Sequence, residues 1–176
     1  MSDVRTPNPE DRNPDPAPFY IRSRVLILGV GNILYGDDGF GPAVAQRLEA
    51  TGLPADIAVM DVGTGVRKIL FNLLFTERRP ELVVVVDAVD RGWPPGELRW
   101  IDLEEIPANK IDDFSLHQAP TSNLLRELRD EAGLPVEVLA CQSAWIPKEM
   151  ESGLSPAVGT AVERACAMIR ERLERH

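Results

Sequence analysis

Residues 24–48, which read RVLILGVGNILYGDDGFGPAVAQRL, decide the fold of this chain. Residues 25–28 are a short apolar run of strand formers, broken by Gly29 and Gly31. This pattern is typical of a buried parallel strand that ends in a tight turn. The apolar positions that follow, as far as Leu48, fall at helical spacing. The stretch therefore predicts a strand, a glycine-rich turn and a helix.

The rest of the chain repeats this alternation. We expect strands at residues 57–60, 81–86, 97–101 and 136–140, with 97–101 as an edge or antiparallel strand. We expect helices at 66–74 with Thr64 as the N-cap, from 116 or from 120–121 towards 128, and after Ser155 and Pro156. The order predicts an α/β fold, a three-layer α/β/α sandwich with a mostly parallel sheet of about five strands.

The length of 176 residues fits one domain. Residues 1–22 are polar and rich in proline, so we expect a disordered lead without a targeting signal, followed by a single α/β domain at 23–176. The most apolar run, 82–86, is much shorter than the roughly 20 residues of a membrane helix. We therefore expect a soluble, cytoplasmic protein without membrane insertion.

Charge and cysteine content exclude further classes. The formal net charge is −9, with 19 Lys and Arg against 28 Asp and Glu, which argues against a nucleic-acid partner. The two cysteines, Cys141 and Cys166, lack the spacing of a disulfide scaffold or a thiolate zinc site. A nucleophilic Cys141 is conceivable, but a buried and inert thiol is the commoner case.

Three side chains are candidates for chemistry. Asp38 follows the first strand, Asp87 stands at the expected tip of the third, and His117 begins the helix after a long acidic loop. If strands one and three are neighbours, both carboxylates share the carboxyl edge of the sheet, and His117 can reach them. Two carboxylates and an imidazole suit zinc, nickel, copper or iron, and three protein ligands leave positions open for substrate or water.

Simpler interpretations stand beside this one. Asp38 could be only a helix cap, His117 only a surface residue, and we interpret Asp37 and Asp61 as turn and cap residues.

Other motifs are absent or incomplete. The GxG of a dinucleotide site lacks its third glycine, because Leu34 stands there, and the chain has no P-loop and no GxSxG elbow.

With these residues in view, the sequence resembles the hydrogenase maturation endopeptidases. These enzymes trim the C-terminal extension from the large subunit of nickel–iron hydrogenases after nickel insertion. The resemblance runs from about residue 24 to 173. Its motifs are LGVGNIL at 28–34, GDDGFG at 36–41, Asp61 with 63–64, VDA at 86–88, SLHQ at 115–118, CQ at 141–142 and GLSP at 153–156.

The resemblance implies that Asp38, Asp87 and His117 form the metal-binding and catalytic cluster. Some members carry glutamate at the position of Asp38, and the shorter aspartate changes ligand reach. It also implies that nickel is carried by the substrate, a hydrogenase large-subunit precursor, and is not held permanently by the protease. A carboxylate, Asp38 first, is expected to position or activate water. We expect a monomer.

Two alternatives stay open at this point. A nickel-sensing chaperone that binds the precursor without cleaving it would keep the same three ligands. A peptidyl-tRNA hydrolase-like enzyme would share the strand, the glycine turn and Asn32, although a tRNA substrate calls for a basic face.

Overall fold

The computed structural model describes residues 18–106 and 121–176. Their elements, in chain order, are α1 (Phe19–Arg22), β1 (Val25–Val30), the 3₁₀ turn η2 (Gly36–Gly39), α2 (Phe40–Thr51), β2 (Ile57–Gly63), α3 (Val66–Phe75), β3 (Leu82–Val89), β4 (Leu98–Ile101), the 3₁₀ turn η3 (Leu103–Glu105), α4 (Thr121–Asp130), β5 (Val136–Gln142) and α5 (Pro156–Leu173).

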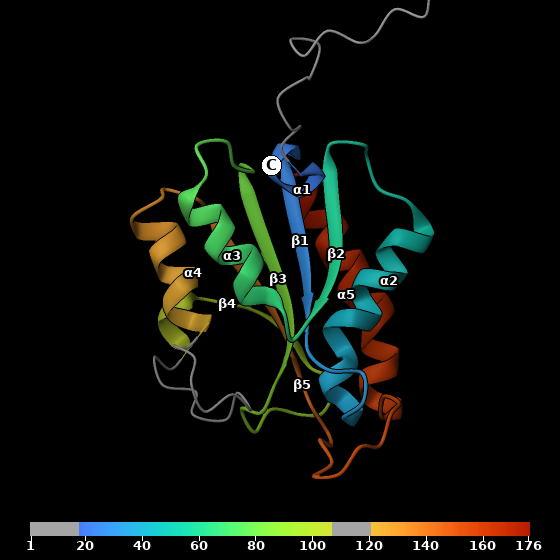
Figure 1. Cartoon of the computed structure of the whole chain (residues 1–176). Coiled ribbons are helices and arrows are strands. Elements are labelled where there is room, and N and C mark those ends of the chain that lie inside the picture. Colours follow the sequence, from blue (N-terminus) through green and yellow to red (C-terminus); the bar gives the residue numbers. More distant parts are fainter. Residues whose placement is uncertain (1–17, 107–120) are drawn as a thin grey trace, which may run out of the picture.

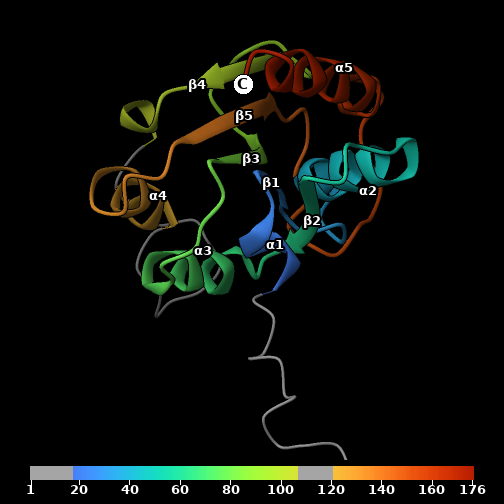
Figure 2. The same cartoon turned by 90° about the horizontal axis from the view of Figure 1, so that it is seen from above.

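A five-stranded sheet in the order β2-β1-β3-β5-β4 forms the centre of the fold. The first four strands are parallel, and β4 pairs antiparallel with β5 at one edge. Helices α2 and α5 cover one face of the sheet, and α3 and α4 cover the other (Figures 1 and 2). The prediction of a three-layer α/β/α sandwich with a mostly parallel sheet is confirmed.

Two hydrophobic cores fill the spaces between the layers. In β1, Val25 and Ile27 belong to the core beneath α2 and α5, while Leu26 and Leu28 belong to the core beneath α3 and α4. A strand that is buried on both faces needs apolar residues at consecutive positions, which explains the unbroken apolar run. The run Leu82 to Val86 in β3 is buried for the same reason.

Two glycines allow α2 to lie directly on the sheet. A Cβ atom on Gly29 would lie 2.3 Å from the carbonyl oxygen of Gly41. A Cβ on Gly41 would lie 2.2 Å from the carbonyl oxygen of Val30. Since real Cβ atoms do not approach so closely, both positions require glycine, and the first turn of α2 is fixed against the end of β1.

Several helix and strand boundaries are confirmed. Strands β1 and β3 are neighbours, with Gly29 opposite Val86. Gly52 ends α2 with φ +74°, a conformation that glycine adopts without strain. The Ser155 hydroxyl accepts a hydrogen bond from the Val158 amide and caps α5, with Pro156 in the first turn. β4 is the expected antiparallel edge strand.

Two strands are longer than predicted. β2 does not stop at Asp61 but continues to Gly63, and α3 then starts after Gly65, so Thr64 is not its N-cap. β3 does not end before Asp87 but runs to Val89, because β5 continues alongside and pairs with it as far as Gln142. Asp87 therefore lies within a strand near its carboxyl end, and not at the tip.

The predicted disordered lead at 1–22 includes four residues that form a helix. Phe19–Arg22 form α1, and Ile21 is only 6% exposed because it packs into the core beneath α3. Disorder was therefore the wrong prediction for these four residues, and residues 1–17 lie outside the described part.

Helix α4 is described from Thr121, so the alternative start at 116 also lies outside the described residues. Within residues 18–106 and 121–176, every helix is too short or too polar to cross a bilayer.

Candidate active site

Asp38 stands on η2, just beyond the end of β1, and is half-buried. Its backbone is fixed on both sides. The Asn32 amide donates a hydrogen bond to the Asp38 carbonyl at 3.1 Å, and the Asp38 amide donates to the Tyr35 carbonyl at 3.1 Å. Gly31 has φ +134°, and a Cβ there would lie 1.9 Å from the Asp38 carbonyl oxygen. The turn around Asp38 is therefore tight and requires glycine at 31.

Asp87 is half-buried in β3, where its register partner on β5 is Ala140. The turn η2 lies against β3. Gly41, three residues after Asp38, would place a Cβ 2.4 Å from the carbonyl oxygen of Val86. Since β1 and β3 are adjacent and parallel, Asp38 and Asp87 occupy the same carboxyl edge of the sheet, as the sequence predicted.

The third proposed ligand, His117, lies outside the described residues. Among residues 18–106 and 121–176, no three His, Cys, Asp or Glu side chains are grouped to hold a metal ion. The cluster of Asp38, Asp87 and His117 therefore remains a prediction. Asp61 has the local role expected of it, because its Oδ1 accepts a hydrogen bond from the Gly63 amide at 3.1 Å.

Asp37 is the residue that sequence reasoning undervalued. Its side chain is fully buried and accepts four hydrogen bonds from the loop between β5 and α5. The donors are the amides of Ala144 and Trp145 to Oδ2 at 2.8 and 2.9 Å, the Ser155 amide to Oδ1 at 2.7 Å and the Ser155 hydroxyl to Oδ2 at 3.0 Å. These partners lie more than a hundred positions away, so spacing gave no signal.

The loop from 143 to 155 runs beside the segment that leads into η2. The Gly36 amide donates to the Glu151 carbonyl at 2.8 Å, and the Glu151 amide donates to the Leu34 carbonyl at 2.9 Å. The Asp37 amide donates to the Trp145 carbonyl at 3.1 Å. These two segments expose large apolar side chains, which we call the apolar rim: Ile33, Leu34, Trp145, Ile146 and Met150. The rim offers an apolar contact surface beside Asp38.

Gln142 organises the neighbouring loop. Its buried side-chain oxygen accepts hydrogen bonds from the amides of Arg91 and Trp93 at 2.8 and 3.1 Å. Its Nε2 donates to Asp90 Oδ1 at 3.1 Å and to the Ser143 carbonyl at 2.9 Å. The amide therefore ties the chain after β3 to the end of β5, which gives a structural role to the CQ motif.

Cys141 is fully buried in β5. Burial raises the pKa of its thiol to about 12, and the nearby carboxylate of Asp37 adds to the rise. A thiol with such a pKa is almost entirely protonated at neutral pH, whereas the thiolate is the nucleophile. The predicted burial of Cys141 is confirmed, and its lack of reactivity stays a prediction.

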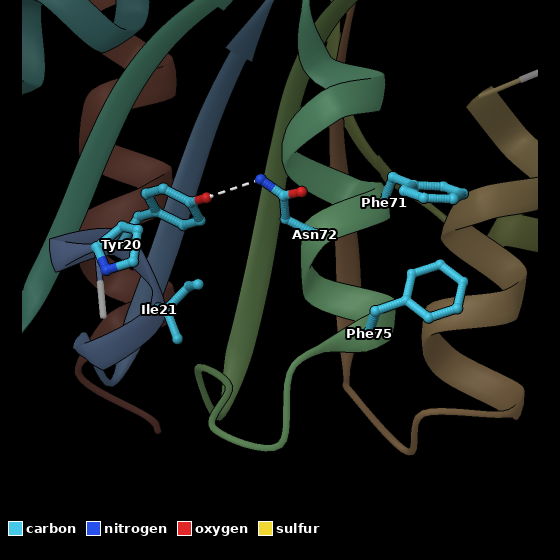
Figure 3. A pocket seen from close by; sticks show the side chains of 6 residues that line it. Tyr20, Ile21, Phe71, Asn72 and Phe75 are labelled. Carbon is cyan, nitrogen blue, oxygen red and sulfur yellow. Dashed lines mark hydrogen bonds between the residues drawn. The ribbon is translucent and has the colours of Figure 1, made fainter. Parts of the chain in front are cut away.

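A cavity of about 470 Å³ lies at the opposite end of the sheet, between α1 and α3 (Figure 3). It is lined mostly by apolar side chains, and the Asn72 side chain donates a hydrogen bond to the Tyr20 hydroxyl at its edge. Since α1 precedes β1, this cavity is at the amino end of the strands (Figure 1). Asp38 and Asp87 lie at the carboxyl end.

Fold and site together define an α/β protein with two carboxylates, Asp38 and Asp87, at the carboxyl edge of a mostly parallel sheet. Residues 42–172 match a family model described as hydrogenase maturation protease. The chain is 36% identical over 146 residues to a putative hydrogenase maturation protease of Methanocaldococcus jannaschii, covering 82% of this chain and 93% of that protein. It is 30% identical over 149 residues to the hydrogenase 2 maturation protease of Escherichia coli, covering 83% and 88%.

Solved structures agree. The [NiFe] hydrogenase maturation protease HycI from Thermococcus kodakarensis superposes with a TM-score of 0.70 at 26% identity, covering 86% of this chain and 93% of that one. The maturating endopeptidase HybD from E. coli gives 0.68 at 26% identity, with the same coverage. The chain belongs to the hydrogenase maturation protease family, and it is therefore a peptidase, a hydrolase. The peptidyl-tRNA hydrolase-like alternative is set aside.

Proposed function

We propose that this protein is a cytoplasmic, monomeric endopeptidase that removes the C-terminal extension from the large-subunit precursor of a nickel–iron hydrogenase after nickel insertion. The observation that carries the proposal is the position of Asp38 and Asp87 at one edge of the sheet, on η2 and β3, which lie against each other. In open α/β sheets this edge is where ligands bind.

Nickel enters this proposal as part of the substrate. Asp38, Asp87 and His117 contact the nickel ion that the precursor already carries, because carboxylate and imidazole are suitable ligands for it. Binding then depends on completed metal insertion, and only a loaded precursor is held with its scissile bond in place. The requirement for nickel makes the peptidase a checkpoint on assembly.

The same carboxylates bear on the chemistry. Asp38 lies on a tight turn at the carboxyl edge of the sheet, where it can orient a water molecule or accept its proton as the peptide bond is attacked. The apolar rim beside Asp38 supplies a surface on which an extended, apolar part of the precursor can lie. Cys141 takes no part, since its thiol is protonated and buried.

The test compares purified precursor with and without nickel. We expect incubation of the nickel-loaded precursor with this protein to release a C-terminal peptide, seen as a loss of mass in both gel and mass spectra. The nickel-free precursor should remain intact. Formation of a stable complex without any loss of mass would show the non-cleaving chaperone instead, and equal cleavage of both precursors would remove nickel from the recognition step.

A further inference from the structure

We infer that Asp37 is a positioning residue, which joins the β5–α5 loop to η2 and thereby sets the place of Asp38. The inference rests on the proposed function and adds a residue to it that has no contact with substrate. Asp37 is 0% exposed, and its carboxylate is occupied by donors from Ala144, Trp145 and Ser155. It therefore cannot act as a metal ligand or a base.

The chemistry at this position requires a carboxylate. Both oxygens of Asp37 accept hydrogen bonds, three from backbone amides and one from the Ser155 hydroxyl. An asparagine has only one accepting oxygen, and its NH₂ group would face backbone N–H donors. The charge also lies at the N-terminus of α5, an 18-residue helix, where a negative group is favoured. Asn at 37 therefore loses at least one of these contacts.

Asp38 follows in the next peptide unit, so a shift of Asp37 moves it. The rest of the turn has little freedom to move, since the backbone of Asp38 is hydrogen-bonded to Asn32 and Tyr35 and packs against Gly31. Displacements of about 1 Å in catalytic groups can cost roughly 100-fold in rate. The buried hydrogen bonds of Asp37 thus determine the position of Asp38, the residue at the sheet edge that we assign to the reaction.

The first experiment measures cleavage by the full chain carrying Asp37→Asn, with Arg79→Ala as the matched control. The Arg79 guanidinium donates to the carbonyls of Leu73, Leu74 and Ala132, and these bonds lie at the other end of the fold. Both substitutions alter a side chain that makes several hydrogen bonds to backbone groups. With nickel-loaded precursor, at a temperature where circular dichroism shows both folded, we expect Asp37→Asn to lower kcat by about tenfold or more and change KM by less than about threefold. Arg79→Ala should cleave like the wild type.

The second experiment is independent of activity. Amide hydrogen exchange is measured for the backbone amides of Asn32 and Asp38, neither of which bonds to the Asp37 side chain. We expect Asp37→Asn to speed exchange at both by about tenfold or more, and Arg79→Ala to leave both unchanged. Faster exchange confined to Ala144, Trp145 and Ser155 would overturn the inference, as would an unchanged kcat.

The two experiments separate the possible failures. If the wild type does not cleave the precursor, the proposed function fails, and hydrogen exchange alone decides whether Asp37 positions Asp38. If Asp37→Asn does not fold, Ser155→Ala replaces it, because this change removes the hydroxyl donor at 3.0 Å from Asp37 and leaves the Ser155 amide bonded to the same carboxylate. The change also removes the side-chain cap that accepts from the Val158 amide. A smaller fall in kcat with faster exchange at Asp38 then supports the inference, and wild-type values for both refute it.

Discussion

Gly41 lies in backbone contact with Val86: a Cβ on Gly41 would stand 2.4 Å from the Val86 carbonyl oxygen. It would also stand 2.2 Å from the carbonyl oxygen of Val30. The start of α2 therefore touches the ends of β1 and β3 at a single residue. Since Asp38 precedes this contact and Asp87 follows Val86, the contact fixes the spacing between the two segments that carry the candidate site.

We expect Gly41→Ala to lower the free energy of unfolding by about 2 kcal/mol or more, because the added methyl group must push α2 away from two carbonyl groups. The matched control is Gly159→Ala in α5, where a Cβ meets nothing within 4 Å. That change should stabilise the protein by about 0.5–1 kcal/mol through helix propensity. Urea unfolding measures both, and equal values for the two variants would contradict the contact at Gly41.

Replacing a proposed ligand should abolish activity without unfolding the protein. Asp38→Asn and Asp87→Asn, which keep side-chain size and remove charge, should each lower kcat/KM on nickel-loaded precursor by about 100-fold or more. Asp56→Asn is the control, since Asp56 pairs with Arg24 at the other end of the sheet. Thermal melts check folding. Wild-type cleavage by Asp87→Asn would exclude this carboxylate from the mechanism.

The Glu137–Arg172 pair should make stability depend on pH in the acid range. Burial raises the pKa of Glu137, but hydrogen bonds from Arg172, the closest at 2.5 Å, and its charge outweigh burial and hold this pKa below its usual 4.5. A folded-state pKa below the unfolded one gives stability that is complete above about pH 4.5 and is lost as the pH falls through the folded value.

Since solvent screens this partly exposed pair, we expect Glu137→Gln to cost about 0.5–1 kcal/mol of unfolding free energy at pH 7, and this difference from the wild type should shrink below pH 4.5. The control is Glu171→Gln, because Glu171 in the last turn of α5 pairs with the exposed Arg175 just beyond the helix, and such pairs contribute little. Chemical denaturation at a series of pH values measures the effect. A pH-independent difference would assign the loss to packing and not to charge.

Cys141 should be unreactive in the folded protein. A thiol that is buried and has a pKa of about 12 should resist iodoacetamide at pH 7 and react only after unfolding in denaturant. Cys141→Ala should retain cleavage of the precursor at a rate within about threefold of the wild type. Mass spectrometry of the labelled protein reports the first result. Rapid labelling at Cys141 under native conditions would show that the strand opens.

The sheet could be predicted because its signals are local. The apolar runs of β1 and β3 are long enough to require burial on both faces, and Gly52 and Ser155 mark helix ends by their own conformational preferences. Strand ends were less predictable. β3 extends past Asp87 because β5 offers pairing partners there, and such partners come from a distant part of the chain.

In the candidate site, too, some features could be predicted from local sequence and others depend on distant partners. Asp38 and Asp87 could be placed at one edge because parallel neighbouring strands bring their carboxyl ends together. The burial of Asp37 could not be foreseen, since Asp37 and Asp38 are chemically identical and adjacent. Only the arrival of Ala144, Trp145 and Ser155 distinguishes them. Likewise, nothing local marked Phe19–Arg22 as a helix within a proline-rich stretch.

Asp38 and Asp87 differ in what carries them, since one is on a short turn and the other within a paired strand. The pairing of β3 with β5 holds Asp87, whose register partner is Ala140, whereas hydrogen bonds of its own backbone to Asn32 and Tyr35 hold Asp38. Since the backbone is fixed at both positions, the length of the acid side chain sets the reach of each carboxylate. A change of acid length at 38 therefore alters how far the carboxylate extends from the turn, and not where the turn lies.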